Sequence, residues 1–184
     1  MGQPLNKESG LPANPKIVVT AEQIQKRIAA IGRQITDDYQ GKTLHVVCVL
    51  ENGFLFAADL VRNLDMPTVC HFVKPFTREV LKGSVTTTEI FFSPELEVKG
   101  NHVLLVEGLM ETGVTTEFLV RNLIGRGALS AKVATLLDRT SQRRIGIQPD
   151  YFGFLINEDF VYGYGLGAPE LGRNLPYVAA GTAS

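Results

Sequence analysis

The sequence predicts an α/β protein in which a parallel sheet is covered by helices. Buried strands and helices alternate along most of its 184 residues, and this rhythm of βαβ units requires parallel strands. The strands are short runs rich in Val, Leu and Ile, as expected for strands buried on both faces. Polar clusters follow three of these strands, at the edge of the sheet where open α/β proteins bind their ligands.

Composition and charge restrict the function classes. The chain has a formal net charge of −1, with 45% hydrophobic and 20% charged residues. This composition is typical of a globular domain, and the near-neutral charge gives no electrostatic basis for binding nucleic acid or membranes. No apolar run is long enough to cross a bilayer, and the first sixteen residues do not resemble a signal peptide. We therefore expect a flexible tail over residues 1–16, a single domain over residues 17–184, and a cytoplasmic location.

The two cysteines, Cys48 and Cys70, both lie in apolar strand-like runs. Two buried thiols are typical of a reducing compartment rather than of a disulfide framework. Neither has a second Cys or a His at metal-ligand spacing, so no zinc site is predicted. His71 is expected to point to the opposite face of its strand as a packed histidine.

The elements follow one another in a regular order. Thr20 begins a helix, because Gln23 completes a capping-box pattern and isoleucines recur at helical spacing from Ile24 to Ile35. The other expected elements are a strand over 44–50, a helix over 54–64, a strand over 68–73, a strand over 103–106, a helix over 117–124, a strand over 131–137, and short aromatic strands over 149–154 and 160–165.

The alternation stops between residues 74 and 99. Residues 86–92 are strand-like, whereas residues 74–85 have no periodicity. An excursion of this kind inside a compact domain is typical of a mobile lid or a hairpin over a binding site.

The most informative stretch runs from Val103 to Thr116. After the strand over 103–106 come a short acidic loop, a Gly/Thr turn and then the helix. Such a turn leaves backbone N–H groups unpaired at the helix start. Together with the helix dipole and the threonine hydroxyls, these donors suit a phosphate monoester. The alternative is a plain strand-to-helix turn.

Two acids in this stretch refine the prediction. Glu107 and Glu111 would repel a phosphate unless a sugar with paired hydroxyls, or a bridging divalent metal, lay between acid and anion. The residues therefore predict a sugar-phosphate site. The stretch is not a P-loop, since no Gly-Lys-Ser/Thr follows, and it lacks the three-glycine dinucleotide spacing.

The same stretch resembles the signature of the type I phosphoribosyltransferases, which bind phosphoribosyl pyrophosphate. That signature is a strand, two acids, two apolar residues, Asp-Thr-Gly and a threonine. The resemblance to the hypoxanthine-guanine branch extends from about Thr20 to Tyr177. It implies a Rossmann-like fold, with a central parallel sheet flanked by helices, a small hood and a flexible lid loop. The family's lid carries a Ser-Tyr pair where this chain has Phe76 and Thr77.

The resemblance also implies the sugar-phosphate half of a site. Gly108 stands where the family has its second acid, and Glu111 replaces an aspartate placed next to the purine N7. Glu111 is therefore the candidate general base or proton partner. The implied contacts are Thr112, Gly113, Val114 and Thr115 with the phosphate, and Glu107 and Gly108 with the ribose.

Three residues are the implied pyrophosphate contacts. The family uses a lysine followed by a glycine in the turn after the 44–50 strand, where this chain has Glu51 and Asn52. Glu51 is either a solvated loop acid or a group that helps to hold the metal. Arg173 matches a pyrophosphate-binding arginine, although by itself it reads as an ordinary C-terminal arginine.

The purine contacts are implied at three further positions. Arg139 stands where the family has a lysine that donates to the exocyclic oxygen of hypoxanthine or guanine. Tyr151 matches an aromatic that stacks on the purine, and Phe152 should present backbone groups to the base edge. The alternatives are a surface arginine and a core tyrosine. Magnesium is the implied cofactor, with Glu107 and Glu158 as candidate ligands.

Two hypotheses follow. The first is a purine phosphoribosyltransferase that transfers ribose 5-phosphate from phosphoribosyl pyrophosphate to a 6-oxopurine and releases pyrophosphate, as in purine salvage. The second is a binding module with the same fold, which holds a purine nucleotide or phosphoribosyl pyrophosphate as a regulator with weak or no transfer activity. In either case the family implies a homodimer or homotetramer. From the near-neutral charge we expect no nucleic-acid or membrane partner.

Overall fold

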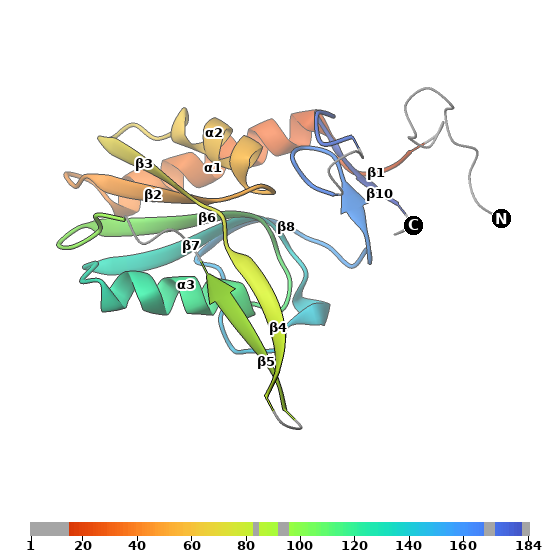
Figure 1. The fold of residues 1–184 in the computed structure, drawn as a ribbon. Coiled ribbons are helices and arrows are strands. Elements are labelled where there is room, and N and C mark those ends of the chain that lie inside the picture. The colour runs from red at the N-terminus through yellow and green to blue at the C-terminus, as the bar shows by residue number, and fades with distance from the viewer. Residues whose placement is uncertain (1–14, 83–84, 92–95, 168–171, 182–184) are drawn as a thin grey trace.

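A five-stranded parallel sheet forms the centre of the molecule (Figure 1). The computed structural model describes residues 15–82, 85–91, 96–167 and 172–181, with side chains described outside 77–95. All four strand pairs in this sheet are parallel, which confirms the predicted fold class. In spatial order the strands are β3 (Thr68–Val73), β2 (Leu44–Val49), β6 (His102–Met110), β7 (Ser130–Asp138) and β8 (Tyr151–Leu155).

Helices cover both faces of the sheet. Helices α1 (Ala21–Asp38) and α2 (Phe54–Val61) lie on one face, and α3 (Val114–Gly125) lies on the other (Figure 1). Each face has its own hydrophobic cluster, so the sheet is buried on both sides. This double burial explains why its strands read as continuous apolar runs.

Helix α1 forms as predicted. The Thr20 hydroxyl accepts a hydrogen bond from the Gln23 amide at 3.2 Å, and the Gln23 side chain accepts one from the Thr20 amide at 2.8 Å. Helical spacing places the predicted isoleucine stripe on the sheet, where all four side chains are buried: Ile24, Ile28, Ile31 and Ile35. Helix α2 ends at Val61, three residues earlier than predicted.

The central strand is longer than its apolar core. Strand β6 continues to Met110, because β7 keeps pairing with it at Glu107, Leu109 and Met110. The acidic loop predicted after residue 106 is therefore wrong, and Glu107 and Gly108 belong to the strand. Helix α3 also begins earlier than predicted, directly after Gly113.

A second, antiparallel sheet provides the expected hood. It has the order β1 (Lys16–Val19), β10 (Val178–Ala180), β9 (Val161–Tyr162) and joins the two ends of the described chain (Figure 1). Lys16, assigned above to the tail, starts β1, and β10 was not predicted. Residues 1–14 lie outside the described part, so the flexible tail stays a prediction.

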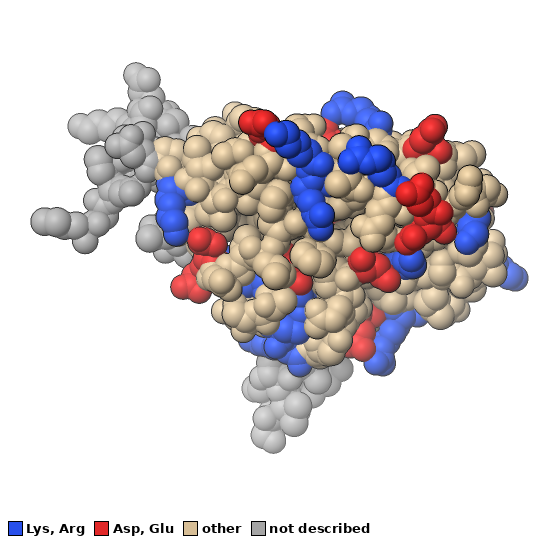
Figure 2. All heavy atoms as spheres, turned by 180° about the vertical axis from the view of Figure 1, so that it is seen from behind, with Lys and Arg blue, Asp and Glu red and all other residues tan. Residues whose placement is uncertain are grey.

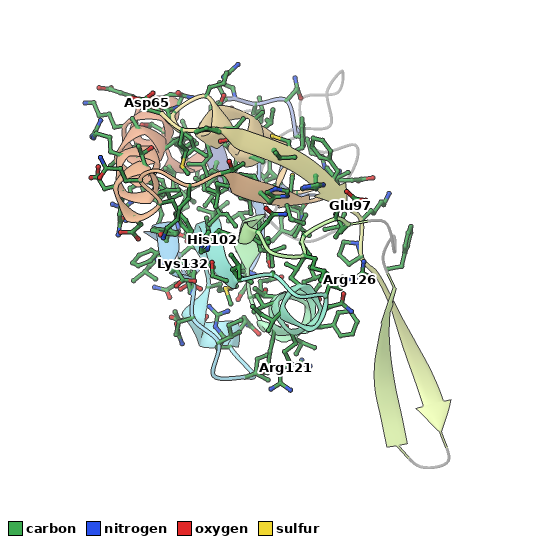
Figure 3. All side chains as sticks on the ribbon, turned by 90° about the vertical axis from the view of Figure 1, so that its left-hand side faces the viewer. Asp65, Glu97, His102, Arg121, Arg126 and Lys132 are labelled. Atoms are coloured by element: carbon green, nitrogen blue, oxygen red, sulfur yellow. The ribbon has the colours of Figure 1, made fainter. Side chains whose placement is uncertain are left out.

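The excursion after β3 is a hairpin. Strands β4 (Phe76–Lys82) and β5 (Val85–Phe91) pair antiparallel and extend away from the central sheet (Figures 1 and 3). Strand β4 was missed, because its sequence has no alternation. Phe76 is exposed, and the side chain of Thr77 lies outside the described set. Closure of this hairpin as a lid stays a prediction.

The exposure of one cysteine corrects the expectation that both thiols are buried. Cys48 is buried, whereas Cys70 on the edge strand β3 is exposed. His71 stacks on His45 of the neighbouring strand, with ring centroids 5.1 Å apart.

Basic and acidic side chains are both spread over the face shown in Figure 2. Within the described residues, none of the helices combines the length and the apolarity needed to span a membrane.

The two thiols should react differently with a chromogenic disulfide reagent. Burial raises the pKa of Cys48 to about 11, and the thiolate is the reactive form, so Cys48 should be protected in the folded protein. We expect one thiol per chain to react in the native state and two after denaturation. The Cys70→Ala variant should lose the native reaction. Equal native reactivity of both thiols would contradict this assignment.

Candidate active site

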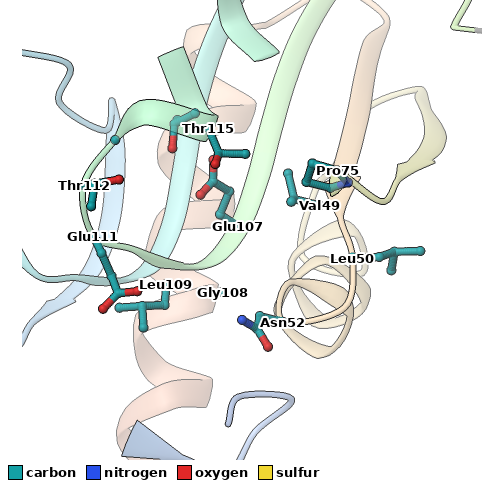
Figure 4. A pocket seen from close by; sticks show the side chains of 12 residues that line it. Val49, Leu50, Asn52, Pro75, Glu107, Gly108, Leu109, Glu111, Thr112 and Thr115 are labelled. Atoms are coloured by element: carbon teal, nitrogen blue, oxygen red, sulfur yellow. The ribbon is translucent and has the colours of Figure 1, made fainter. Parts of the chain in front are cut away.

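A cavity of about 420 Å³ lies at the carboxyl ends of β2 and β6 (Figure 4). The turn after β2, the end of β6 and the first turn of α3 form its walls, and Pro75 after β3 closes one side. This is the edge at which parallel α/β sheets bind ligands. Most of the predicted sugar-phosphate residues line this cavity: Glu107, Gly108, Glu111, Thr112, Gly113 and Thr115.

The turn into α3 is built to expose backbone donors. Gly113 has φ 79°, a left-handed conformation that lets the chain pass from β6 into the helix. A side chain there would also meet Ile147, whose Cγ2 lies 2.7 Å from the Cβ position. The Val114 amide donates to the Thr112 hydroxyl at 3.3 Å, and the first amides of the helix have no carbonyl partner within it. These features suit an anion.

Glu107 is a buried acid beneath this turn. Its side chain points toward the start of α3 (Figure 4), and its Oε1 has no hydrogen-bond partner among the described residues. Burial raises the pKa of Glu107 to about 7, although the Thr116 hydroxyl and the charge of Arg143 act in the opposite direction. A buried unpaired oxygen is costly, so this carboxyl group is suited to a hydroxyl donor or a cation brought by a ligand.

Glu111 and Arg139 form an ion pair across the ends of β6 and β7. The Arg139 backbone amide donates to the carbonyl of Met110 at 2.9 Å, which fixes the two strand ends together. The Arg139 side chain is buried, while that of Glu111 is 45% exposed. Two guanidinium nitrogens of Arg139, Nε and Nη2, have no partner among the described residues. Arg139 is therefore not a surface arginine, and it keeps donors free beside the candidate base.

A second arginine beside the cavity, with a largely buried side chain, was not predicted as a site residue. Arg143 pairs with Asp138 at the end of β7, and its Cδ lies 3.4 Å from the Cβ position of Gly113. It therefore brings a positive charge beside the phosphate turn. No sequence signal distinguishes Arg143 from its neighbour Arg144 in a run that reads as a polar surface loop. Leu109, whose side chain lines the cavity near Glu111 (Figure 4), was also not singled out.

The predicted pyrophosphate residues lie together beside the turn after β2. Glu51 bonds Arg173 and Lys74, each at 2.7 Å, and these contacts lower the pKa of Glu51 to about 2. Arg173 also donates to the carbonyl of Gly167 at 2.8 and 3.1 Å. Asn52 lines the cavity itself. Glu51 is thus not a free loop acid but a partner of two cations, and a contact with the metal stays a prediction.

Comparison with known proteins assigns the family. The phosphoribosyl transferase domain model matches residues 17–168. This chain is a member of the phosphoribosyltransferase family. It is 36% identical over 168 residues to the hypoxanthine-guanine phosphoribosyltransferase of Mycobacterium tuberculosis, covering 88% of this chain and 83% of that protein.

Other relatives agree with this assignment. A crystal structure of a hypoxanthine phosphoribosyltransferase from Staphylococcus aureus is similar, with a TM-score of 0.78 and 33% identity over 90% of each chain. The chain is also 34% identical to the bifunctional protein TilS/HprT of Listeria innocua over 165 residues. That match covers 89% of this chain, which spans only a quarter of the length of that relative.

The phosphoribosyltransferase fold places three predicted residues away from the cavity. Tyr151 is buried beneath α1, where its hydroxyl donates to Asp38 at 2.5 Å. The Phe152 carbonyl accepts from Arg27 of α1 at 2.6 Å. Glu158 bonds Lys16 of the hood at 3.3 Å. Stacking by Tyr151, base-edge contact by Phe152 and metal binding by Glu158 therefore stay predictions, at positions outside this cavity.

Strand register explains why Tyr151 lies outside the cavity. Tyr151 pairs with Ala134 in the middle of β7, and the chain reaches the end of β7 only at Ile156, whose amide donates to the Asp138 carbonyl. Arg139 follows Asp138 directly, so Tyr151 lies several residues from the strand end that carries the site. Matching an aromatic by order along the chain could not reveal this offset.

Glu107 should make stability depend on pH. Its folded pKa of about 7 exceeds the ordinary value of 4.5, so the protonated acid is favoured in the folded state. The resulting stability is complete below about pH 4.5 and is lost as pH rises to 7, by about 3 kcal/mol in the unfolding free energy. The gain in unfolding free energy of Glu107→Gln over wild type, measured by urea unfolding, should be larger at pH 8 than at pH 5. Equal differences at both pH values, or the same effect in the control Glu22→Gln, would contradict the assignment.

Proposed function

We propose that this phosphoribosyltransferase transfers the 5-phosphoribosyl group of phosphoribosyl pyrophosphate to hypoxanthine or guanine and releases pyrophosphate. The observation that carries the proposal is the buried, partly unpaired carboxyl of Glu107 beneath the open helix start at Gly113. Donors that suit a phosphate and a carboxyl group that can accept a hydrogen bond from a hydroxyl thus share one cavity. The names of the relatives support the purine class of the substrate.

The 5′-phosphate would bind the amides after Gly113 and the hydroxyls of Thr112 and Thr115, with Arg143 adding charge from below. The ribose hydroxyls would bind Glu107. This arrangement leaves the anomeric carbon facing the turn after β2, where the pyrophosphate must leave, and the purine facing the ends of β6 and β7. Leu109 offers an apolar surface for the base.

The reaction exchanges one bond at the anomeric carbon for another. The bond from that carbon to the pyrophosphate oxygen breaks, and the purine nitrogen forms a new bond to the same carbon through an oxocarbenium-like state. Glu111 would take up the purine proton, and Arg139 would donate to the 6-oxo group through its free nitrogens. Arg173 would stabilise the departing pyrophosphate once its bond to Glu51 opens.

Magnesium fits this site only as an ion that arrives with the substrate. The described residues hold no group of three His, Cys, Asp or Glu suited to a metal, whereas Glu107 has one carboxyl oxygen unpaired. Mg²⁺ is commonly held by one or two carboxylates together with substrate phosphates. It would neutralise charge on the leaving pyrophosphate. Glu158, the other predicted ligand, lies outside this cavity beside Lys16.

A second candidate is a nucleotide-binding regulator with weak transfer activity. The ion pairs of Glu51 with Arg173 and of Glu111 with Arg139 favour it, because both must rearrange before substrate can use the arginines. In either role we place the chain in the cytoplasm as a homodimer or homotetramer. Two free cysteines are compatible with a reducing compartment, and the exposed Val69 and Phe72 on edge strand β3 offer an apolar surface for association.

Glu111 should be needed for turnover. Loss of a general base lowers kcat by about 10²- to 10⁴-fold, so nucleotide formation from phosphoribosyl pyrophosphate and hypoxanthine or guanine should fall by this factor in Glu111→Gln. The amide retains an acceptor for Arg139, so this variant should keep its melting temperature, whereas Glu111→Ala leaves a buried guanidinium unpaired. Glu22→Ala is the control. A wild-type protein that binds a purine monophosphate without turning over any base would favour the regulator.

Glu51 should weaken substrate binding by holding Arg173. Removing its charge in Glu51→Gln frees Arg173 and Lys74 for pyrophosphate. Exposed ion pairs are weak, so the KM for phosphoribosyl pyrophosphate should fall by only roughly two- to fivefold. The control Glu22→Gln removes an exposed ion pair with Lys26 on α1, remote from the cavity. A higher KM in Glu51→Gln would show instead that Glu51 itself assists the substrate.

A further inference from the structure

Gly108 is in contact with the backbone of the opposite wall of the cavity. A Cβ atom at this position would lie 2.2 Å from the carbonyl oxygen of Asn52 and 2.7 Å from its carbonyl carbon. It would also lie 2.9 Å from the side chain of Leu166. Since the nearest two atoms are backbone, a change of rotamer cannot relieve the contact. Any side chain at position 108 requires the turn after β2 to move.

The turn itself has little room to move. A Cβ atom at Gly53 would meet the carbonyl oxygens of Val49 and Val106 at 2.6 and 3.0 Å. On the hood side, the Asn52 carbonyl lies 3.3 Å from the Cβ position of Gly165. The turn is therefore packed between the central sheet and the hood. This packing excludes an acidic side chain at position 108.

The side chain of Asn52, in contrast to the packed backbone of the turn, is open to the cavity. It is exposed, it lines the same cavity as Glu107 and Gly108, and it lies across from Gly108 and Leu109 (Figure 4). Its amide makes no hydrogen bond to another residue in the described part of the chain. A polar side chain thus enters the cavity from the turn, next to a strand position that can carry none.

We propose that the Asn52 amide binds a ribose hydroxyl opposite Glu107. This inference rests on the proposed function and names a specificity-determining residue within it. A ribose hydroxyl needs both an acceptor and a donor, and an amide offers both, whereas a carboxylate offers only acceptors. The amide is also neutral, so it adds no negative charge beside Glu107 and an anionic substrate.

The steric part of the proposal is tested by a pair of glycine variants. Gly108→Ala should lower the melting temperature by roughly 3–10 °C, because an added methyl group overpacks a closed contact. Gly125→Ala is the matched control, since no atom lies within 4 Å of its Cβ position. Equal melting temperatures for wild type and Gly108→Ala would overturn the claim that the turn excludes a side chain at position 108.

The binding part is tested with Asn52→Ala, which keeps the backbone of the turn. GMP and 2′,3′-dideoxyguanosine monophosphate, which lacks both ribose hydroxyls, are titrated by calorimetry. Loss of one hydrogen bond should raise the Kd of GMP by about tenfold, while the Kd of the dideoxy nucleotide changes less than about twofold. Asn52→Asp, which replaces the amide with a carboxylate, should also bind GMP more weakly than wild type does.

The outcomes separate the two proposals. Suppose that wild type binds GMP. If Asn52→Ala then binds GMP equally well, or if its Kd values for GMP and the dideoxy nucleotide rise by the same factor, the role of Asn52 is overturned while the proposed function stands. If wild type binds neither GMP nor phosphoribosyl pyrophosphate, the proposed function fails and the role of Asn52 fails with it.

Discussion

The site depends on one buried carboxyl group at the end of the central strand. Strand β6 has a neighbour on each side and helices on both faces, so Glu107 is almost completely removed from water. The folded chain leaves one of its oxygens without a protein partner. Burial of this kind is unfavourable for stability, and it is tolerated because the same position lies directly beneath the helix start that suits a phosphate.

The acids around Glu107 are neutralised by arginines from other elements. Glu111 at the end of β6 pairs with Arg139, Asp138 at the end of β7 pairs with Arg143, and Glu51 pairs with Arg173 near the hood. Each pair joins segments that are separated in sequence or meet only at a strand end. A phosphorylated ligand would therefore exchange partners with these arginines rather than meet free positive charge. The affinity of the site is a difference between two sets of ionic contacts, and the residues at positions 51 and 111 determine that difference.

Several parts of the site follow from local sequence patterns. The Gly-Thr turn, its helix and the acid before it could be recognised because their chemistry lies within about ten consecutive residues. The capping box at Thr20 and the isoleucine stripe of α1 are equally local. The predicted residues that lie away from the cavity depend on register between strands: Tyr151 and Phe152 are displaced from the strand end by the pairing of β8 with β7, and Glu158 bonds Lys16 of the hood.

The sequence alone determined the alternating α/β architecture, the glycine-threonine turn before α3 and the family, because hydrophobic periodicity and short motifs are properties of neighbouring residues. Only the tertiary structure decided which charges face each other, that Cys70 is exposed, and that the backbone of Asn52 occupies the space beside Gly108. These features arise where segments far apart in the chain come into contact. Their distances are set by packing, and packing is not encoded in any single stretch of the sequence.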